Sequence, residues 1–360
     1  MKLKLGLPPW TIVTPLVAWL AYFGSGISSA MFFILLLSVI LVGGVLAAVY
    51  HAELIAHRVG EPFGTIILAL AVTIIEVSLI LSLMSSGGEK TEALARDTVF
   101  AAIMIILTGI IGICILVGGA KFREQFIIKH SASSALIALT AILVLTLVVP
   151  NYTISQPGPV YTTPQLIFVA IVSLILYGSF IMIQSVRHRD YFLSQDHGDS
   201  DEAHALPPTN KATISSLVLL LVSLGAVVLL AKTLSPTIES VVSSMGAPNA
   251  LVGIIIAMVV LLPECIAAIQ AARRDRLQTS MNLALGSALA SIGLTIPAVA
   301  LFSLFTGSTV MLGIDTTSTV LLILSIFTVM LSLVTGKTNI LYGIVLLVIF
   351  AAYLFFTIFP

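Results

Sequence analysis

The chain has few charged residues and few cysteines. Only 9% of its 360 residues are Asp, Glu, Lys or Arg, and 59% are hydrophobic, whereas soluble domains carry about a quarter charged residues. This shortage of charge excludes an ordinary soluble protein and predicts one embedded in a membrane. The two cysteines, Cys114 and Cys265, lie in apolar runs, which favours small buried side chains over a disulfide framework or an iron–sulfur site.

Motifs for hydrolysis and nucleotide binding are also missing. The sequence has no His-Glu-x-x-His, no serine nucleophile elbow and no P-loop. Its six histidines are expected in loops or at the ends of apolar runs. These absences argue against an intramembrane enzyme and exclude a nucleotide-driven pump. Neither a cofactor nor a nucleic-acid partner is expected, and the lipid bilayer is the predicted surrounding.

Apolar runs long enough to cross a bilayer as helices fill most of the chain. They are placed at residues 7–24, 29–50, 63–86, 98–119, 131–150, 164–186, 212–232, 247–272, 279–305, 316–335 and 339–359. The first run is interpreted as a helix rather than a cleaved signal peptide, because no clean small-residue cleavage site follows it. The sequence therefore predicts an all-α membrane protein with eleven transmembrane helices.

Positive charge is distributed unequally between the two ends of these helices. With the N-terminus in the cytoplasm, only Lys90, Arg96 and Lys232 of the 16 Lys and Arg residues fall on the extracytoplasmic side. Because Lys and Arg concentrate in cytoplasmic loops, this bias predicts a cytoplasmic N-terminus and, with eleven spans, an extracytoplasmic C-terminus. The predicted location is the plasma (inner) membrane.

A polar stretch near the middle divides the chain. Residues 187–211 form an acidic loop, expected in the cytoplasm, with six spans before it and five after it. We expect an N-terminal helix in residues 1–28, a first five-helix repeat in 29–186 and a second in 212–360. An odd number of helices per repeat forces the two repeats into opposite orientations, which is the inverted-repeat plan of many secondary transporters.

Two carboxylates, Glu76 and Glu264, lie deep inside apolar runs. Each is near the middle of the second helix of its half. An ionisable residue at bilayer depth is costly, so it marks a functional site by default. The alternative is a buried pair that holds helices together, a task usually given to Ser, Thr or Asn. We therefore predict that both glutamates bind cations and protons.

Local motifs carry a resemblance to a known family. The segments Glu76-Val-Ser-Leu-Ile80, Leu262-Pro-Glu-Cys-Ile266 and Asn282-Leu-Ala-Leu-Gly-Ser287, together with residues 52–64, resemble the two α-repeats of the calcium/cation antiporter superfamily. Within it the chain is similar to bacterial calcium/proton exchangers of the ChaA type. The resemblance implies one acidic ligand per repeat at the midplane, which corresponds to Glu76 and Glu264.

The chain departs from the family pattern beside both glutamates. The Gly-Asn pair before the first glutamate is Val72-Thr73 here, and its counterpart is Val260-Leu261. The Gly-Ser pair of the third helix is kept at Gly286-Ser287 but is Ala101-Ala102 in the first half. These departures bear on cation selectivity more than on the mechanism.

Further oxygen ligands are predicted near the glutamates. Pro263 lacks an N–H and so frees the carbonyl of Val259, while hydroxyls and amides suit hard cations such as Ca²⁺ and Na⁺. The supporting candidates are Thr73, Asn282, Ser287, Ser291 and Val259, for which helix packing is the alternative role. A cytoplasmic vestibule that collects cations is predicted from Glu53, His57 and Glu61, with a solvated linker as the alternative.

These features predict a secondary antiporter that exports cations in exchange for protons by alternating access. The transported ions are Ca²⁺, and Na⁺ or K⁺, against H⁺. Two protons or one divalent ion neutralise a pair of carboxylates, so only the loaded site can be occluded at low cost. A cation channel is the main alternative, and an intramembrane enzyme is a weaker one.

Overall fold

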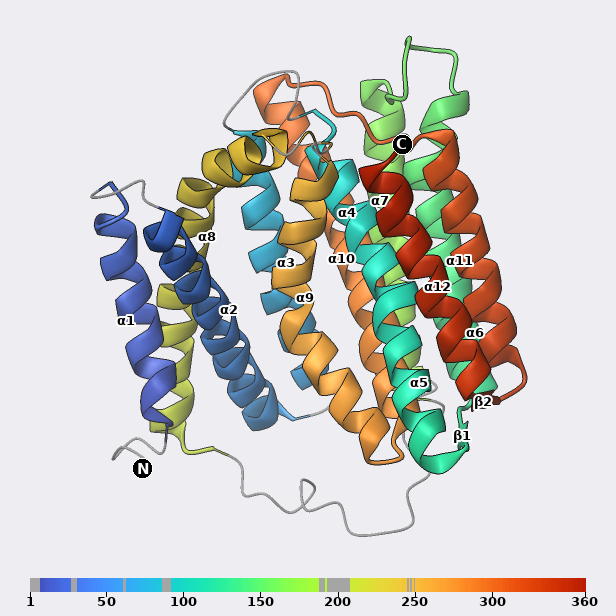
Figure 1. Ribbon diagram of the computed structural model, residues 1–360, viewed down its shortest axis with the longest axis horizontal. Coiled ribbons are helices and arrows are strands. Elements are labelled where there is room, and N and C mark those ends of the chain that lie inside the picture. Colours follow the sequence, from blue (N-terminus) through green and yellow to red (C-terminus); the bar gives the residue numbers. More distant parts are fainter. Residues whose placement is uncertain are drawn as a thin grey trace. The chain divides into compact units, whose positions relative to one another are not determined.

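The computed structural model describes residues 7–26, 31–60, 63–85, 92–187, 192, 208–244, 246, 248 and 250–360 (Figure 1). Helices account for most of these residues. The first half contains α1 (Pro9–Phe23), α2 (Met31–Val59), α3 (Phe63–Met84), α4 (Leu94–Met104), η2 (Ile105–Ile110), α5 (Ile111–Phe122), β1 (Glu124–Phe126), α6 (Lys129–Leu143), η3 (Val144–Val148), η4 (Val149–Tyr152), α7 (Thr163–Met182) and η5 (Ile183–Arg187). The second half contains α8 (Asn210–Ser244), α9 (Ala250–Arg273), α10 (Leu277–Thr306), α11 (Thr316–Val334), β2 (Lys337–Asn339) and α12 (Ile340–Ile358).

The described residues form eleven continuous helical segments, because α4, η2 and α5 join into one, as do α6 with η3 and η4, and α7 with η5. Nine of them are long and apolar enough to cross a membrane, and α1 and residues 69–84 of α3 are shorter apolar helices. The prediction of an all-α membrane fold with eleven helices is confirmed.

Two helices extend well beyond the predicted spans. The helix α2 runs to Val59 rather than to residue 50, and α8 runs from Asn210 to Ser244 rather than from 212 to 232. Hydropathy marks where an apolar run ends, whereas a helix continues through polar residues until its backbone is interrupted. The interruption after α2 is Gly60, whose φ of 75° lies in the left-handed region that glycine adopts readily.

The chain folds into two compact units that do not follow its sequential halves. Unit 1 comprises Met1–Leu83 and Gln195–Val241, and therefore contains α1, α2, most of α3 and most of α8. Unit 2 comprises Met84–Ser194 and Val242–Pro360. Each unit therefore contains helices from both predicted repeats. The predicted repeats stay a prediction, and their bounds differ from those of the two packed units.

A few polar contacts join the apolar helices of unit 1. Trp19 of α1 donates its indole N–H to the carbonyl of Val222 on α8, over 3.0 Å. The same ring lies close to Gly225, where a side chain would not fit without a shift. The α1 and α2 helices pack side by side in the same unit (Figure 1).

Unit 2 is built around the long helix formed by α4, η2 and α5. Of the 18 most apolar consecutive residues of this helix, 89% are buried, a larger share than in any other apolar segment of the described residues. It packs against α9, α10 and α12, while α10 also packs against α6 and α7. A π-helical turn, η2, interrupts the buried helix at its middle, and such turns often occur at functional sites.

Corresponding helices of the two halves run in opposite directions within unit 2. The start of α4 lies beside the segment that follows α10, because Arg96 donates from Nη1 to the carbonyl of Gly313 over 3.0 Å. The segment that follows α5 lies beside the start of α10, because Gln125 donates from Nε2 to Asp275 Oδ1 over 2.8 Å. The third helices of the two halves are therefore antiparallel.

The fourth helices show the same relation. The backbone N–H of Ile127, just before α6, donates to the carbonyl of Gly336, just after α11, over 3.1 Å. At the opposite end, Asn151 of η4 donates from Nδ2 to the carbonyl of Ile314, just before α11, over 2.6 Å. This antiparallel arrangement is the one that the inverted-repeat prediction requires.

Two strand contacts between connecting segments agree with this antiparallel relation of the two halves. The antiparallel pair β1–β2 joins the connection between the third and fourth helices of the first half to that between the fourth and fifth helices of the second half. An isolated antiparallel bridge between Val160 and Met311 joins the two complementary connections. In both contacts, the connection between the third and fourth helices of one half pairs with the connection between the fourth and fifth helices of the other half. A two-fold relation between the halves requires this pattern.

The two ends of unit 2 differ in charge. The basic end carries the connections after α5, α9 and α11, and the positive residues in and beside these connections are Lys121, Arg123, Lys129, Arg273, Arg274, Arg276 and Lys337. The acidic end carries the connections before α4, α7 and α11, and its charged residues within the described part of the chain are Glu92, Arg96, Asp97 and Asp315.

The crossing of α5 with α12 depends on glycine at Gly343. A Cβ at this position would lie 2.6 Å from the backbone N of Leu116 and 2.8 Å from the carbonyl O of Gly112. Neither backbone atom can move without displacing the helix, so Gly343→Ala is expected to destabilise the protein by about 1–3 kcal/mol. Thermal unfolding of the purified protein in detergent measures the change.

The matched control for this variant is Gly178→Ala on α7. Gly178 is also a helical glycine, but a Cβ there would meet no atom within 4 Å. Alanine favours a helix over glycine by about 1 kcal/mol, so the control should be as stable as the wild type or more so. Equal stability of both variants would show that the two helices do not approach this closely.

Candidate functional site

Glu76 lies on α3, in unit 1, and its side chain is only 4% exposed. Thr73, one turn earlier on the same helix, is likewise buried. Its hydroxyl donates to the carbonyl of Ala69 over 2.9 Å. Because this bond uses the hydroxyl hydrogen, the oxygen keeps lone pairs with which it can bind a cation.

Glu264 lies on α9, in unit 2, directly after Pro263. The helix continues through Pro263, although proline has no N–H to donate to the carbonyl of Val259 four residues earlier. Glu264 is half-buried and its Oε2 atom is fully buried. The arrangement thus offers a carboxylate and a backbone carbonyl released from helix bonding within about one and a half turns of each other.

The two candidate serines lie on α10, which packs against α9. A hydrogen bond from Ser280 Oγ to the carbonyl of Ala268, 2.9 Å long, fixes how the two antiparallel helices align. At 1.5 Å per residue, this alignment puts Ser287 about 4.5 Å from the level of Glu264, and Ser291 about 10 Å from it. Ser287 is half-buried and Ser291 is buried. The structure therefore favours Ser287 as the nearer supporting oxygen.

Asn282 lies near the same level but makes other contacts. Its Oδ1 accepts from Ser131 Oγ on α6 over 2.9 Å and from Gln278 Nε2 over 2.8 Å. Its Nδ2 donates to the carbonyl of Phe192 over 2.6 Å. A ligand role for Asn282 would require it to give up bonds within this network, so the packing role that the sequence left open is the one its contacts support.

The predicted vestibule residues lie on the extended end of α2. Glu53 and His57 are one turn apart on the helix and both are exposed. They belong to a helix rather than to the solvated linker considered as the alternative. Glu61 lies outside the described residues. Arg58 beside them donates to Asn210 Oδ1, at the start of α8, over 2.6 Å.

His51 lies directly after the apolar run of residues 29–50, where the sequence predicts it. The structure adds that α2 continues past this run to Val59 and that the His51 side chain is fully buried in unit 1. Its Nε2 lies 3.0 Å from the carbonyl of Thr11 on α1, and its Nδ1 lies 3.2 Å from Ser216 Oγ on α8. A carbonyl can only accept, so Nε2 carries the hydrogen. The ring ties three helices together, a contact that spacing along the sequence does not reveal.

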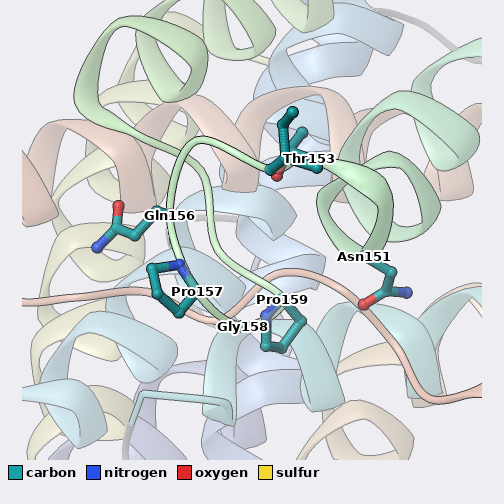
Figure 2. Close-up of a pocket in the computed structure, with 7 residues that line it drawn as sticks. Asn151, Thr153, Gln156, Pro157, Gly158 and Pro159 are labelled. Carbon is teal, nitrogen blue, oxygen red and sulfur yellow. The ribbon is translucent and has the colours of Figure 1, made fainter.

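A surface pocket lies on the connection between η4 and α7, at the acidic end of unit 2 (Figure 2). Its lining consists of Asn151, Thr153, Ile154, Gln156, Pro157, Gly158 and Pro159. These residues carry no formal charge, so the pocket does not offer the carboxylates expected of a cation site. The connection is fastened by Tyr161, whose hydroxyl donates to the carbonyl of Leu145. Burial raises the pKa of Tyr161 to about 12, so the phenol keeps its proton.

The family described as sodium/calcium exchanger protein matches residues 29–186 and 215–359 of the chain. The chain belongs to this family. The match confirms the resemblance to calcium/cation antiporters. It falls in two stretches, one on each side of the central loop.

Two curated relatives cover most of the exchanger. The protein y4hA of Sinorhizobium fredii is 46% identical over 89% of this chain and 87% of its own length. The sodium-potassium/proton antiporter ChaA of Escherichia coli is 34% identical over 96% of this chain and 94% of its own. Exchangers couple two ion fluxes and catalyse no covalent chemistry, so the enzyme alternative is excluded. The protein is an integral membrane antiporter of cations.

Solved structures show the same fold. YfkE superposes with a TM-score of 0.71 at 18% identity, over 98% of this chain and 100% of its own. The H⁺/Ca²⁺ exchanger CAX superposes with a TM-score of 0.66 at 17% identity, over 96% of this chain and 88% of its own. At this identity the likeness establishes the all-helical exchanger fold alone.

Proposed function

We propose that the exchanger moves Ca²⁺, and also Na⁺ and K⁺, out of the cytoplasm in return for protons, and that Glu76 and Glu264 bind both kinds of ion. The observation that carries this proposal is that each of the two carboxylates lies in the second helix of its half, near the middle of an apolar run. The relative ChaA, a sodium-potassium/proton antiporter, supports the choice of ions.

The coupling follows from charge. Two ionised carboxylates are costly to enclose in a medium of low dielectric, whereas two protons, or one divalent cation, neutralise them. Only a neutralised pair can then cross between inward-facing and outward-facing states. One monovalent cation with one retained proton gives the same net charge, so the pair accommodates Na⁺ or K⁺ by the same rule.

Ligand number sets the expected preference among these ions. Selective Ca²⁺ binding takes about six to eight oxygens, and this chain has Thr73 and Leu261 where the family pattern has asparagine before each glutamate. Leucine supplies no side-chain oxygen, so water must complete the shell. We expect modest affinity for Ca²⁺, measurable exchange of Na⁺ and weaker exchange of K⁺.

Reconstituted vesicles test both the activity and the ions. Vesicles with an internal pH dye are challenged separately with Ca²⁺, Na⁺ and K⁺, and the dye should report proton movement for each. Proton movement with micromolar Ca²⁺ and none with concentrated Na⁺ or K⁺ would contradict the broad specificity. Ion currents without proton movement would favour a channel instead.

The distribution of charge indicates which end of the protein faces the cytoplasm. The basic end of unit 2 gathers Lys and Arg from three connections, and such ends face the cytoplasm. On this basis the N-terminus is cytoplasmic and the C-terminus extracytoplasmic. A reporter fused after Pro360 should be active outside the cytoplasm, and one placed between residues 187 and 211 should be active inside; activity of both on one side would contradict the scheme.

A further inference from the structure

Two buried threonine hydroxyls of unit 2 make no hydrogen bond with any residue that the structure describes. They are Thr98 Oγ1 on α4 and Thr295 Oγ1 on α10, and both side chains are 0% exposed. Other buried threonines, such as Thr108 and Thr146, donate to a carbonyl of their own helix. A buried hydroxyl without a protein partner is usually satisfied by a bound water molecule.

The two hydroxyls lie at the same level of unit 2. A Cβ on Gly253 of α9 would be 3.1 Å from the backbone N of Thr98, so Gly253 marks the level of Thr98 on α9. The bond between Ser280 and Ala268 fixes a common level of α9 and α10. Toward the acidic end, Gly253 lies fifteen residues from Ala268 on α9, and Thr295 lies fifteen residues from Ser280 on α10. Both are therefore about 22 Å from that bond along their helices, and α10 also packs against α4.

The same face of α9 continues from this level to Glu264. Gly253, Ala257, Val260 and Glu264 are spaced by four, three and four residues, which puts them in one row along the helix. Glu264 lies eleven residues, or about 16 Å, from Gly253. Two of the three residues that precede Glu264 in this row have a side chain no larger than a methyl group.

Small side chains also mark the facing helices between the threonines and Glu264. On α4, the turn after Thr98 carries Ala101 and Ala102, both buried. On α10, the residues one and two turns before Thr295 on its face are Ser291 and Ala288, also buried. Three helices that pack together thus present alanine, glycine or serine at neighbouring positions.

We propose that Thr98 and Thr295 hold water between α4, α9 and α10, and that this water is the outer part of a path that carries protons to and from Glu264. Each hydroxyl can accept a proton from one water molecule while it donates its own to the next, so a proton crosses without either threonine becoming charged. At the acidic end, the partly exposed ion pair of Arg96 and Asp97, 2.7 Å apart, stands next to Thr98 along the chain. The proton-carrying role rests on the proposed function of Glu264, whereas the presence of water does not.

Thiol labelling tests for the water without any transport measurement. Thr98→Cys and Thr295→Cys are each introduced into a chain with Cys114→Ala and Cys265→Ala, and treated with 2-aminoethyl methanethiosulfonate, which reacts with hydrated thiolates. Thr146→Cys on η3, which continues α6, is the control, because Thr146 is equally buried but its hydroxyl donates to the carbonyl of Ile142 in the same continuous helix. Mass spectrometry should show reaction at positions 98 and 295 at least tenfold faster than at 146. Rates equal to the control at both positions would overturn the water site.

Valine substitution tests the proton path. Thr98→Val and Thr295→Val keep the shape of the side chain and remove the hydroxyl, so each should slow proton-coupled exchange about tenfold while equilibrium binding of Ca²⁺ is unchanged. Thr146→Val should exchange at the wild-type rate. If the cysteine variants are labelled but both valine variants exchange at the wild-type rate, the proton path is refuted and the water site is retained. Absence of exchange in the wild type would instead refute the proposed function, and the labelling result would remain valid.

Discussion

Glu76→Gln and Glu264→Gln are each expected to abolish cation/proton exchange. Glutamine keeps the volume of the side chain and most of its hydrogen bonding, but it can neither bind a cation by charge nor release a proton. The remaining carboxylate alone cannot alternate between a divalent cation and two protons. We expect a loss of at least about a hundredfold in dye-reported proton flux, because the electrostatic term of a buried charge is worth several kcal/mol.

The loss must be separated from misfolding. Each variant should insert in the membrane and purify as a single species in detergent, since a neutral glutamine is less costly at that depth than a carboxylate. Glu124→Gln is the matched control, because Glu124 is exposed and makes only a surface ion pair with Lys337, 3.4 Å long, of the kind that contributes little. More than a small residual exchange in either buried variant would remove that glutamate from the proposed site.

Exchange is also expected to rise steeply from acidic to alkaline pH. Protons and cations compete for the same carboxylates, so a cation can bind only after a proton has left. In acid the pair is protonated and exchange is low; in alkali the pair is ionised and exchange is high. For each proton that must leave, the ionised fraction increases up to tenfold per pH unit until it saturates.

The measurement holds the cation gradient fixed and varies pH equally on both sides of the vesicle. Raising the cation concentration should move the rise toward lower pH, because a competing ligand displaces protons. This shift distinguishes competition at one site from an effect of pH on protein stability. If pH acted only through stability, raising the cation concentration would not move the rise in exchange toward lower pH. A rate that is flat from mildly acidic to alkaline pH would contradict competition.

Local features of the sequence were sufficient for the helices and for the two acidic candidates. A bilayer supplies no hydrogen bonds to the backbone, so an apolar run that crosses it must be a helix. Length and hydropathy therefore located all eleven helices, although they placed the ends of α2 and α8 too early. A carboxylate inside such a run stands out without any knowledge of its neighbours, as Glu76 and Glu264 did.

Which helices and side chains contact one another became clear only from the tertiary structure. The division into two units that each mix helices from both halves, the burial of His51 between α1 and α8, and the bonds of Asn282 with Ser131 and Phe192 all join residues that are distant in sequence. The hydroxyls of Thr98 and Thr295 look like any others in a membrane helix until the helices around them are placed. The sequence by itself determined the class of the protein, its helices and its charged candidates, because these follow from short runs of residues and the properties of the bilayer. Which helices meet, and which polar groups are thereby satisfied or left to water, depends on contacts about 40 to 200 residues apart, and only the folded chain fixes them.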